Sequence, residues 1–261
     1  MKKQIQRILA KADLMITKRS HFDRIRQKAR VLERYEYDLK LVRSLVPEYR
    51  SRVIDLLPES RSQLRQDLFV LAHLNFLEHG FFVEFGATDG VEKSNSFLLE
   101  KKFQWKGILA EPAMQWHKAL ERNRSCTIDK RCVWRSSGEQ LLFNEAENGE
   151  FSTINSFSAN DRHSRRREAG IRYKVESISL TDLLNSHQAP QLIDYLSIDT
   201  EGSEYEILKA FDFESFQFKV ISVEHNYTSN REKIEKLLTS QGYLVMKQNL
   251  SRFEDWYVLA S

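Results

Sequence analysis

The second part of the chain alternates short apolar runs with segments of helical length. Such alternation is typical of a parallel β-sheet covered by helices, because each strand must return to the same end of the sheet before the next begins. The expected strands, in chain order, are Phe81–Phe85, Gly107–Glu111, Cys126–Val133, Ile193–Asp199, Phe218–Glu224, Tyr243–Lys247 and Phe253–Ala260.

Two features depart from this simple alternation. Residues 134–180 contain further strand-like pieces, Gln140–Phe143 and Tyr173–Ile178, and we interpret them as an insertion. The last two strands are joined by too few residues for a crossover, so they must pair as an antiparallel hairpin. The predicted fold is α/β, with a Rossmann-like, seven-stranded, mostly parallel sheet ending in an antiparallel hairpin. That ending is typical of methyltransferases, whereas dinucleotide dehydrogenases usually keep the sheet parallel.

The first part of the chain reads as helices. Leu64, Leu68, Leu71 and Leu74 recur at helical spacing before Gly80. The segment before them is only weakly amphipathic, and it could be an arm or a dimerisation element. We therefore predict an N-terminal helical extension over residues 1–60, a possible means of homodimerisation, and a catalytic domain over residues 61–261.

The net charge of +3 conceals a basic N-terminus, where residues 1–35 hold eleven Lys and Arg against three acidic residues. A second basic group contains Arg162, Arg165, Arg166, Arg167, Arg172 and Lys174. Either group could meet nucleic acid, an acidic membrane surface or an anionic substrate, or could be a solvated surface.

Other features narrow the class of protein. No apolar run is long enough to span a membrane, and charged residues interrupt any signal-peptide core, so contact with a membrane would be peripheral. Cys126 and Cys132, expected on one face of a strand, read as free thiols in a reducing cytoplasm.

A glycine-containing turn follows the first expected strand. Gly86 and Gly90 would allow a tight turn and close approach of a ligand to the backbone, and Glu111 ends the next strand twenty-one residues after Gly90. An acid there accepts hydrogen bonds from ribose hydroxyl groups in folds of this kind. The candidate cofactor-binding residues of the turn are Glu84, Gly86, Ala87, Thr88, Asp89 and Gly90.

The turn favours S-adenosylmethionine over a nicotinamide dinucleotide. Thr88 stands where a pyrophosphate-binding turn could carry its middle glycine, and Glu84 precedes the turn. S-adenosylmethionine has no phosphate and carries two positive groups, which an acidic residue suits. The alternative role for Glu84 is to brace the turn.

Four segments resemble the FkbM family of methyltransferases: Val83–Gly90, Ser94–Ser96, Trp105–Pro112 and Leu196–Glu204. The resemblance covers about residues 61–260, and its most specific element is Asp-x-Glu-Gly-x-Glu. It implies O-methylation, often of sugar hydroxyls or polyketide alcohols, with S-adenosylmethionine. Many members carry Asp in place of Glu84 and Asn in place of Thr88, which are mild departures.

The candidate catalytic residues end the fourth and fifth core strands. Methyl transfer to an alcohol needs alignment of donor and acceptor and removal of a proton. Asp199 and Glu201 follow one strand and His225 the next, where α/β sheets present ligand-facing groups. Asp199 could instead anchor the turn. A divalent cation on Asp199, Glu201 and Glu224 is a minority alternative, and we expect no metal.

Further residues complete the expected site. Ser94 and Asn95 could receive the methionine carboxylate, and Cys132 and Val133 should border the adenine. Gln66 and Asp67 could cover the amino-acid end of the cofactor or be merely solvated. The insertion would form a lid over the acceptor, and if its arginines face the cleft, the acceptor is anionic.

The leading hypothesis is an S-adenosylmethionine-dependent O-methyltransferase acting on a hydroxyl of a carbohydrate or glycan-like small molecule. The alternative is a catalytically weak binding module that docks a partner through the basic N-terminal helices. A nucleic-acid methyltransferase is less favoured, because the chain lacks the Asn/Asp-Pro-Pro-aromatic element of base-methylating enzymes. A nicotinamide oxidoreductase is disfavoured by the glycine pattern.

Overall fold

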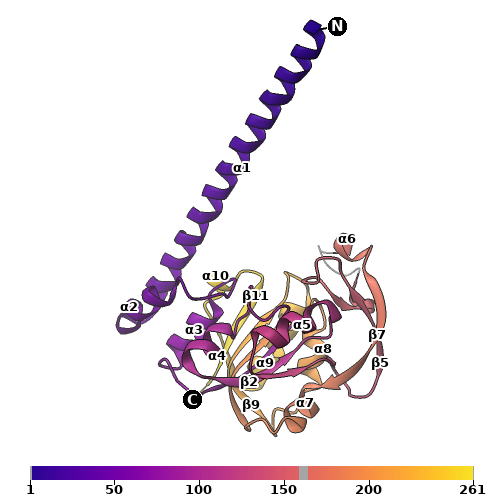
Figure 1. Ribbon diagram of the computed structural model, residues 1–261. Helices are drawn as coiled ribbons and strands as arrows, with labels where there is room; N and C mark the ends of the chain where they lie inside the picture. The colour runs from indigo at the N-terminus through magenta and orange to yellow at the C-terminus, as the bar shows by residue number, and fades with distance from the viewer. Residues whose placement is uncertain (1, 159–163, 261) are drawn as a thin grey trace. The chain divides into compact units, whose positions relative to one another are not determined.

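The computed structural model describes residues 2–158 and 164–260, with side chains from residue 21 onward (Figure 1). The chain divides into two compact units, Met1–Ile54 and Asp55–Ser261. Within the described residues, no helix is both long and apolar enough to cross a membrane.

The first unit is built on one long helix. Helix α1 (Lys2–Ser44) has 43 residues, and α2 (Pro47–Leu56) follows it after a short turn. Arg50 of α2 donates hydrogen bonds to the carbonyl oxygens of Leu45 and Arg43, which satisfies two acceptors at the end of α1. The helical character expected for residues 1–60 is therefore observed, as one long and one short helix.

The second unit contains the expected seven-stranded sheet. Its order is β10-β11-β9-β8-β1-β2-β3. The strands are β1 (Phe81–Phe85), β2 (Lys106–Ala110), β3 (Thr127–Asp129), β8 (Leu192–Ile198), β9 (Gln217–Glu224), β10 (Tyr243–Met246) and β11 (Glu254–Leu259). β11 pairs antiparallel with both β10 and β9, and the remaining pairs are parallel. The predicted fold class, including the antiparallel terminal hairpin, is confirmed.

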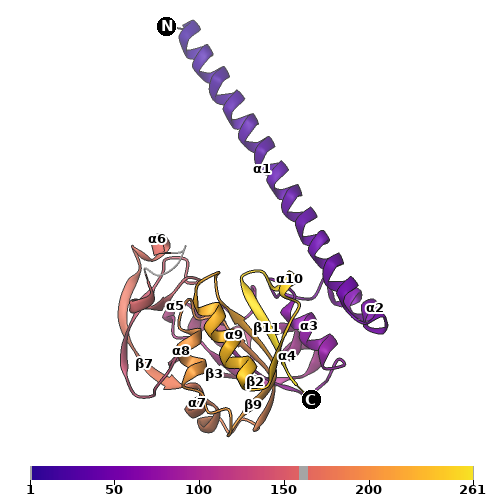
Figure 2. The ribbon, with the colours of Figure 1, turned by 180° about the vertical axis from the view of Figure 1, so that it is seen from behind.

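Helices cover both faces of this sheet, as the opposite views of Figures 1 and 2 show. One face carries α3 (Gln66–His73), α4 (Phe97–Phe103) and α5 (Met114–Asn123). The other carries α8 (Glu204–Lys209) and α9 (Asn230–Ser240), while α7 (Leu180–Ser186) precedes β8 and the short α10 (Gln248–Ser251) precedes β11. The inner surfaces of strands and helices form one apolar core that includes Val83, Leu196 and Ile221, each fully buried.

The insertion forms a second, smaller sheet of order β4-β7-β5-β6. Its strands are β4 (Cys132–Trp134), β5 (Gln140–Glu145), β6 (Thr153–Ile154) and β7 (Ile171–Ser179), with a 3-10 turn, η1 (Asn155–Phe157), and helix α6 (Ser164–Arg167) between β6 and β7. Phe143, Ile154 and Trp134 form part of its own apolar cluster.

The prediction of a single strand over Cys126–Val133 is wrong, because the structure has two strands there. The chain turns at Asp129, whose carboxylate accepts a hydrogen bond from the backbone N–H of Arg131 (2.9 Å). β3 therefore belongs to the large sheet and β4 to the small one. Cys126 precedes β3 and Cys132 begins β4, so the two cysteines do not share the face of one strand; both are free thiols.

Candidate functional site

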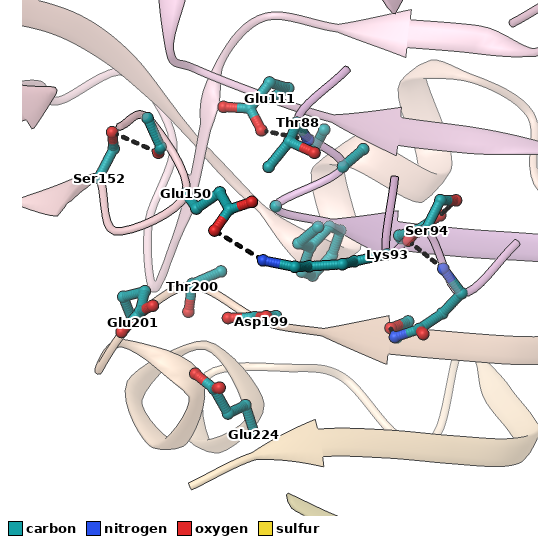
Figure 3. Close-up of a pocket in the computed structure, with 18 of the residues that line it drawn as sticks. Thr88, Lys93, Ser94, Glu111, Glu150, Ser152, Asp199, Thr200, Glu201 and Glu224 are labelled. Carbon is teal, nitrogen blue, oxygen red and sulfur yellow. Dashed lines mark hydrogen bonds and ion pairs between the residues drawn. The ribbon is translucent and has the colours of Figure 1, made fainter. Parts of the chain in front are cut away.

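A cavity of about 250 Å³ lies at the carboxyl ends of β1, β2, β8 and β9, where open α/β sheets bind ligands. Figure 3 shows side chains from the strand ends and from the insertion converging on it. Of the residues expected to bind a cofactor, those that line it are Glu84, Gly86, Ala87, Thr88, Ser94, Asn95, Glu111, Cys132 and Val133. Asp199 and Glu201 line it too, whereas Asp89, Gly90 and His225 do not.

Gly86 is required where β1 and β8 approach each other. Its φ is +72°, and a Cβ built there would lie 2.1 Å from the carbonyl oxygen of Asp199, far closer than atoms can approach. Gly90, with φ +77°, packs against Leu120 and Arg124 instead, where a Cβ would lie 2.6 Å from each side chain. Gly86 therefore forms part of the cavity wall. Gly90 instead allows the turn to pack closely against Leu120 of α5 and against Arg124.

Glu111 is held by the backbone on both sides. Its Oε2 accepts the N–H of Thr88 and its Oε1 accepts the N–H of Ala113, each at 2.9 Å. The side chain is buried, and burial raises its pKa to about 7, against the effect of those two hydrogen bonds. The acid at the end of β2 is thus fixed directly beside the glycine turn.

Glu84 braces the loop that follows the turn. Its Oε1 accepts the N–H of Asn95 (2.7 Å), and its Oε2 accepts the hydroxyl groups of Ser94 (2.9 Å) and Ser96. Arg124 Nη1 lies 3.9 Å from Oε2. The structure thus gives Glu84 the bracing role that the sequence left as the alternative.

Asn95 lines the cavity and has a buried amide oxygen. Its Nδ2 donates to Ser197 Oγ (2.9 Å), whereas its Oδ1 is buried without a hydrogen-bond partner among the described residues. The expectation that Ser94 and Asn95 receive the methionine carboxylate stays a prediction.

Three carboxylates meet at the ends of β8 and β9. Asp199, Glu201 and Glu224 each offer an oxygen atom within 4.8 Å of the others. Burial and the charges of Asp199 and Glu201 raise the pKa of Glu224 well above its usual value. Such a group favours a shared proton or a positive charge nearby.

Glu201 has a buried positive partner. Arg167 of α6 donates from Nη2 to Glu201 Oε2 at 2.8 Å, and both side chains are buried. Asn226 Nδ2 reaches the same oxygen at 3.3 Å and Glu224 Oε2 at 2.6 Å. Glu201 therefore ties the insertion to the β8 turn.

His225 follows β9 as expected, but its ring does not reach the cavity. Nδ1 accepts the N–H of Tyr227 (3.0 Å), and Nε2 lies 3.6 Å from Asp255 Oδ2. Burial lowers its pKa, so the ring is neutral near pH 7. Its lone pair is already engaged, which makes it a poor base for an acceptor in this cavity.

The cavity wall is strongly acidic. Its carboxylate residues are Glu84, Glu92, Glu111, Glu150, Asp199, Glu201, Glu224 and Glu254. Among the described lining residues, Lys93 is the one positive side chain. Lys93 Nζ contacts Glu150 Oε2 at 2.7 Å and so joins the loop after β1 to the insertion (Figure 3).

Sequence reasoning missed Lys93, Glu150 and Glu254. Lys93 directly precedes the Ser94–Asn95 pair, and that adjacency was an available signal. Glu254 accepts a hydrogen bond from Nε2 of Gln66 (2.8 Å), which lines the cavity as expected, whereas Asp67 does not line it. Burial raises the pKa of Glu254 to about 8.

The described residues of the insertion's basic group do not line the cavity. Arg165 and Arg166 are exposed, and Arg166 lies over the ring of Phe151 at 4.3 Å. Arg167 is buried on Glu201. Arg162 lies outside the described residues.

The sheet order, the hairpin and the acid-bordered turn define a Rossmann-like methyltransferase. Residues 84–245 match the model of the methyltransferase FkbM domain, and the chain belongs to this family. The resemblance read from the four sequence segments is confirmed.

The chain matches no curated protein significantly, but it is similar to solved structures. Methyltransferase FkbM from Methylobacillus flagellatus KT is 11% identical, with 88% of this chain and 60% of that chain covered and a TM-score of 0.45. A putative RNA methyltransferase from Pyrococcus horikoshii is 14% identical, with 70% and 68% covered and a TM-score of 0.36.

Proposed function

We propose that the protein is an S-adenosylmethionine-dependent O-methyltransferase acting on a hydroxyl group of a carbohydrate or glycan-like small molecule. The observation that carries the proposal is the charge of the cavity. Eight carboxyl groups and one lysine line it among the described residues, and acidic groups outnumber the cation even though burial leaves Glu111 and Glu254 partly protonated near pH 7. A negative potential favours a ligand with an ammonium and a sulfonium, and it disfavours the pyrophosphate of a dinucleotide.

The described lining residues offer suitable groups for the ribose, the adenine and the amino-acid part of this cofactor. Glu111 offers carboxylate oxygens to the ribose hydroxyl groups, and Cys132 and Val133 provide an apolar wall for the adenine. The acidic wall suits the ammonium, while Lys93 is the cation available to the carboxylate. When bound, S-adenosylmethionine supplies an activated methyl group.

The remaining chemistry is alignment and proton removal. Asp199 and Glu224 lie at the strand ends, where either group, when ionised, would accept the proton of an acceptor hydroxyl. The hydroxyl oxygen would bond to the methyl carbon as the carbon–sulfur bond breaks, and the sulfur would leave as a neutral thioether. Holding the two reactants in line supplies most of the rate enhancement expected for a displacement of this kind. His225 is not needed in this scheme. The two free thiols suit a cytoplasmic reaction.

Calorimetric titration with S-adenosylmethionine tests the cofactor assignment. We expect saturable binding by the full chain, weakened about 10- to 100-fold in Glu111→Ala, since a hydrogen bond to a charged group contributes about 1.5–3 kcal/mol. Glu121→Ala, which removes an exposed carboxylate on α5, is the matched control and should bind normally. Binding of NAD in place of S-adenosylmethionine would overturn the proposal.

A further inference from the structure

Arg124 is a buried arginine that packs against the glycine turn. It follows α5, and its side chain has no exposed surface, although the residue does not line the cavity. A buried guanidinium group needs partners for its charge and for its N–H donors, because an unpaired buried charge is costly. The partners of Arg124 therefore show which segments of the chain it holds.

The guanidinium group of Arg124 contacts three segments. Its Nη1 donates to the carbonyl oxygen of Gly90 (3.0 Å) and to Ser94 Oγ (3.1 Å). Its Nη2 donates to Ser96 Oγ (2.8 Å), and its Nε donates to Glu100 Oε2 (2.6 Å). Gly90 ends the turn after β1, the two serines belong to the following loop, and Glu100 lies in α4. A lysine has one nitrogen and cannot replace this planar set of donors.

The loop that contains the two serines is fixed from both sides. The hydroxyl groups of Ser94 and Ser96 accept hydrogen bonds from Arg124, and both donate to Glu84 Oε2. Arg124 Nη1 lies 3.9 Å from the same carboxylate oxygen. Glu84 Oε1 accepts the backbone N–H of Asn95 at 2.7 Å. The serine hydroxyl groups thus bridge two opposite buried charges, and the backbone of the loop is tied to β1.

This loop supplies one wall of the first cavity. Lys93, Ser94 and Asn95 all line it. In the proposed function, this wall meets the amino-acid part of S-adenosylmethionine, and Lys93 is the cation available to the carboxylate. Arg124 lies outside the wall but contacts the segment that forms it. Its effect on a ligand would therefore pass through the loop.

The residue proposed for the ribose is held by other contacts. Glu111, at the end of β2, accepts the backbone N–H groups of Thr88 and Ala113. In Figure 3, Glu111 lies beside Thr88 and away from Ser94. Among the described residues, none of the hydrogen bonds of Arg124 goes to Glu111. Loss of the Arg124 contacts should therefore disturb one end of the cavity more than the other.

We propose that Arg124 is a positioning residue for the amino-acid part of S-adenosylmethionine, which it serves by holding the Lys93–Asn95 loop through Ser94 and Ser96. The adenosine part depends instead on Glu111 and its backbone contacts. This inference rests on the proposed function and adds a residue outside the cavity wall.

The test compares two ligands that share the adenosine group. S-adenosylhomocysteine retains the amino-acid part, whereas 5′-methylthioadenosine lacks it. Arg124→Lys keeps the buried positive charge but loses the planar set of donors. In calorimetric titrations of the full chain, we expect this variant to raise the Kd of S-adenosylhomocysteine about tenfold, and that of 5′-methylthioadenosine less than about twofold.

Ser96→Ala tests the same network without changing a buried charge. Ser96 does not line the cavity, and its hydroxyl group is one of the two bridges between Arg124 and Glu84. This variant should raise the Kd of S-adenosylhomocysteine by about three- to tenfold, again without a matching effect on 5′-methylthioadenosine. It decides the question if Arg124→Lys does not fold.

Arg231→Lys is the matched control. Arg231 forms two hydrogen bonds with Asp255, at 2.7 and 2.8 Å, in the same unit and outside the cavity wall. It should change neither Kd. Equal losses for the two ligands, or an unchanged Kd of S-adenosylhomocysteine in folded Arg124→Lys or in Ser96→Ala, would overturn the inference. Failure of the wild-type chain to bind S-adenosylmethionine would instead refute the proposed function.

Discussion

Arg167 and Glu201 form a buried ion pair, 2.8 Å between Nη2 and Oε2, that joins the insertion to the turn after β8. The pair connects α6 of the insertion to the wall of the first cavity, because Glu201 lines that cavity. The position of the insertion beside the β8 turn thus depends on a contact between residues 34 positions apart.

Breaking this pair should destabilise the second unit. Arg167→Met leaves the Glu201 carboxylate buried without its guanidinium, and removal of one partner of a buried pair typically costs about 3–5 kcal/mol. Urea unfolding measures the loss. The double variant Arg167→Met/Glu201→Gln should recover part of it, since the uncompensated charge is gone. If Arg167→Met were as stable as the wild type, the ion pair would not contribute to the free energy of unfolding.

Substitution of Gly86 should be far more damaging than substitution of another glycine with positive φ. Gly138→Ala has nothing within 4 Å of its new Cβ and should cost about 1 kcal/mol for the left-handed backbone alone. Gly86→Ala adds overlap with the Asp199 carbonyl and should cost about 1–3 kcal/mol more. We also expect it to abolish binding of S-adenosylmethionine, measured by calorimetry. Equal effects of the two variants would mean that β1 and β8 separate easily.

Stability should decrease as the pH rises from about 5 to 8. Burial raises the pKa of Glu111 to about 7 and that of Glu254 to about 8, so the folded chain holds protons that the unfolded chain has released. A folded state that binds more protons loses stability with rising pH, through the window between the unfolded and folded pKa values. Urea unfolding at pH 5, 6, 7 and 8 measures the slope, which Glu254→Gln should reduce. A rising slope in the wild type would contradict the prediction.

Helix α1 should associate with a second copy of itself. Ile25, Leu32 and Leu39 recur every seven residues and are 50%, 67% and 57% exposed. Lys28 and Glu33 flank this stripe at positions that face each other in a parallel two-stranded coiled coil. Light scattering should report a dimer of the full chain and a monomer for Leu32→Glu. Leu244→Glu, at another exposed leucine, is the control; a monomeric wild type would refute this interface.

Much of the fold was predictable from the sequence. Strands β1, β2, β8 and β9 are buried on both faces of the sheet. Each therefore appears in the sequence as a run of consecutive apolar residues, which predicts a buried strand. The division of Cys126–Val133 between two sheets was not predictable in this way. It depends on a turn at Asp129, where the charged residues Asp129, Lys130 and Arg131 interrupt the apolar pattern without indicating that the two halves join different sheets.

The site was predictable as far as strand ends place residues. Glu111 and Asp199 line the cavity because parallel strands end at the same edge of the sheet. His225 does not line this cavity, because its ring contacts the backbone N–H of Tyr227 and lies near Asp255. The Lys93–Glu150 and Arg167–Glu201 ion pairs join segments that are distant in the sequence. No local sequence pattern predicts which residues form such pairs.

The contact of Lys93 with Glu150 links what enters the first cavity to the freedom of the insertion. A carboxylate on an incoming ligand that reaches Lys93 must compete with Glu150 for its ammonium. If the ligand carboxylate displaced Glu150 from Lys93, the residues near Gly149 would lose their ion pair with the loop after β1. Amide hydrogen exchange around Gly149 would then be faster when the cavity is occupied, because loss of the Lys93–Glu150 ion pair would leave this part of the insertion less restrained.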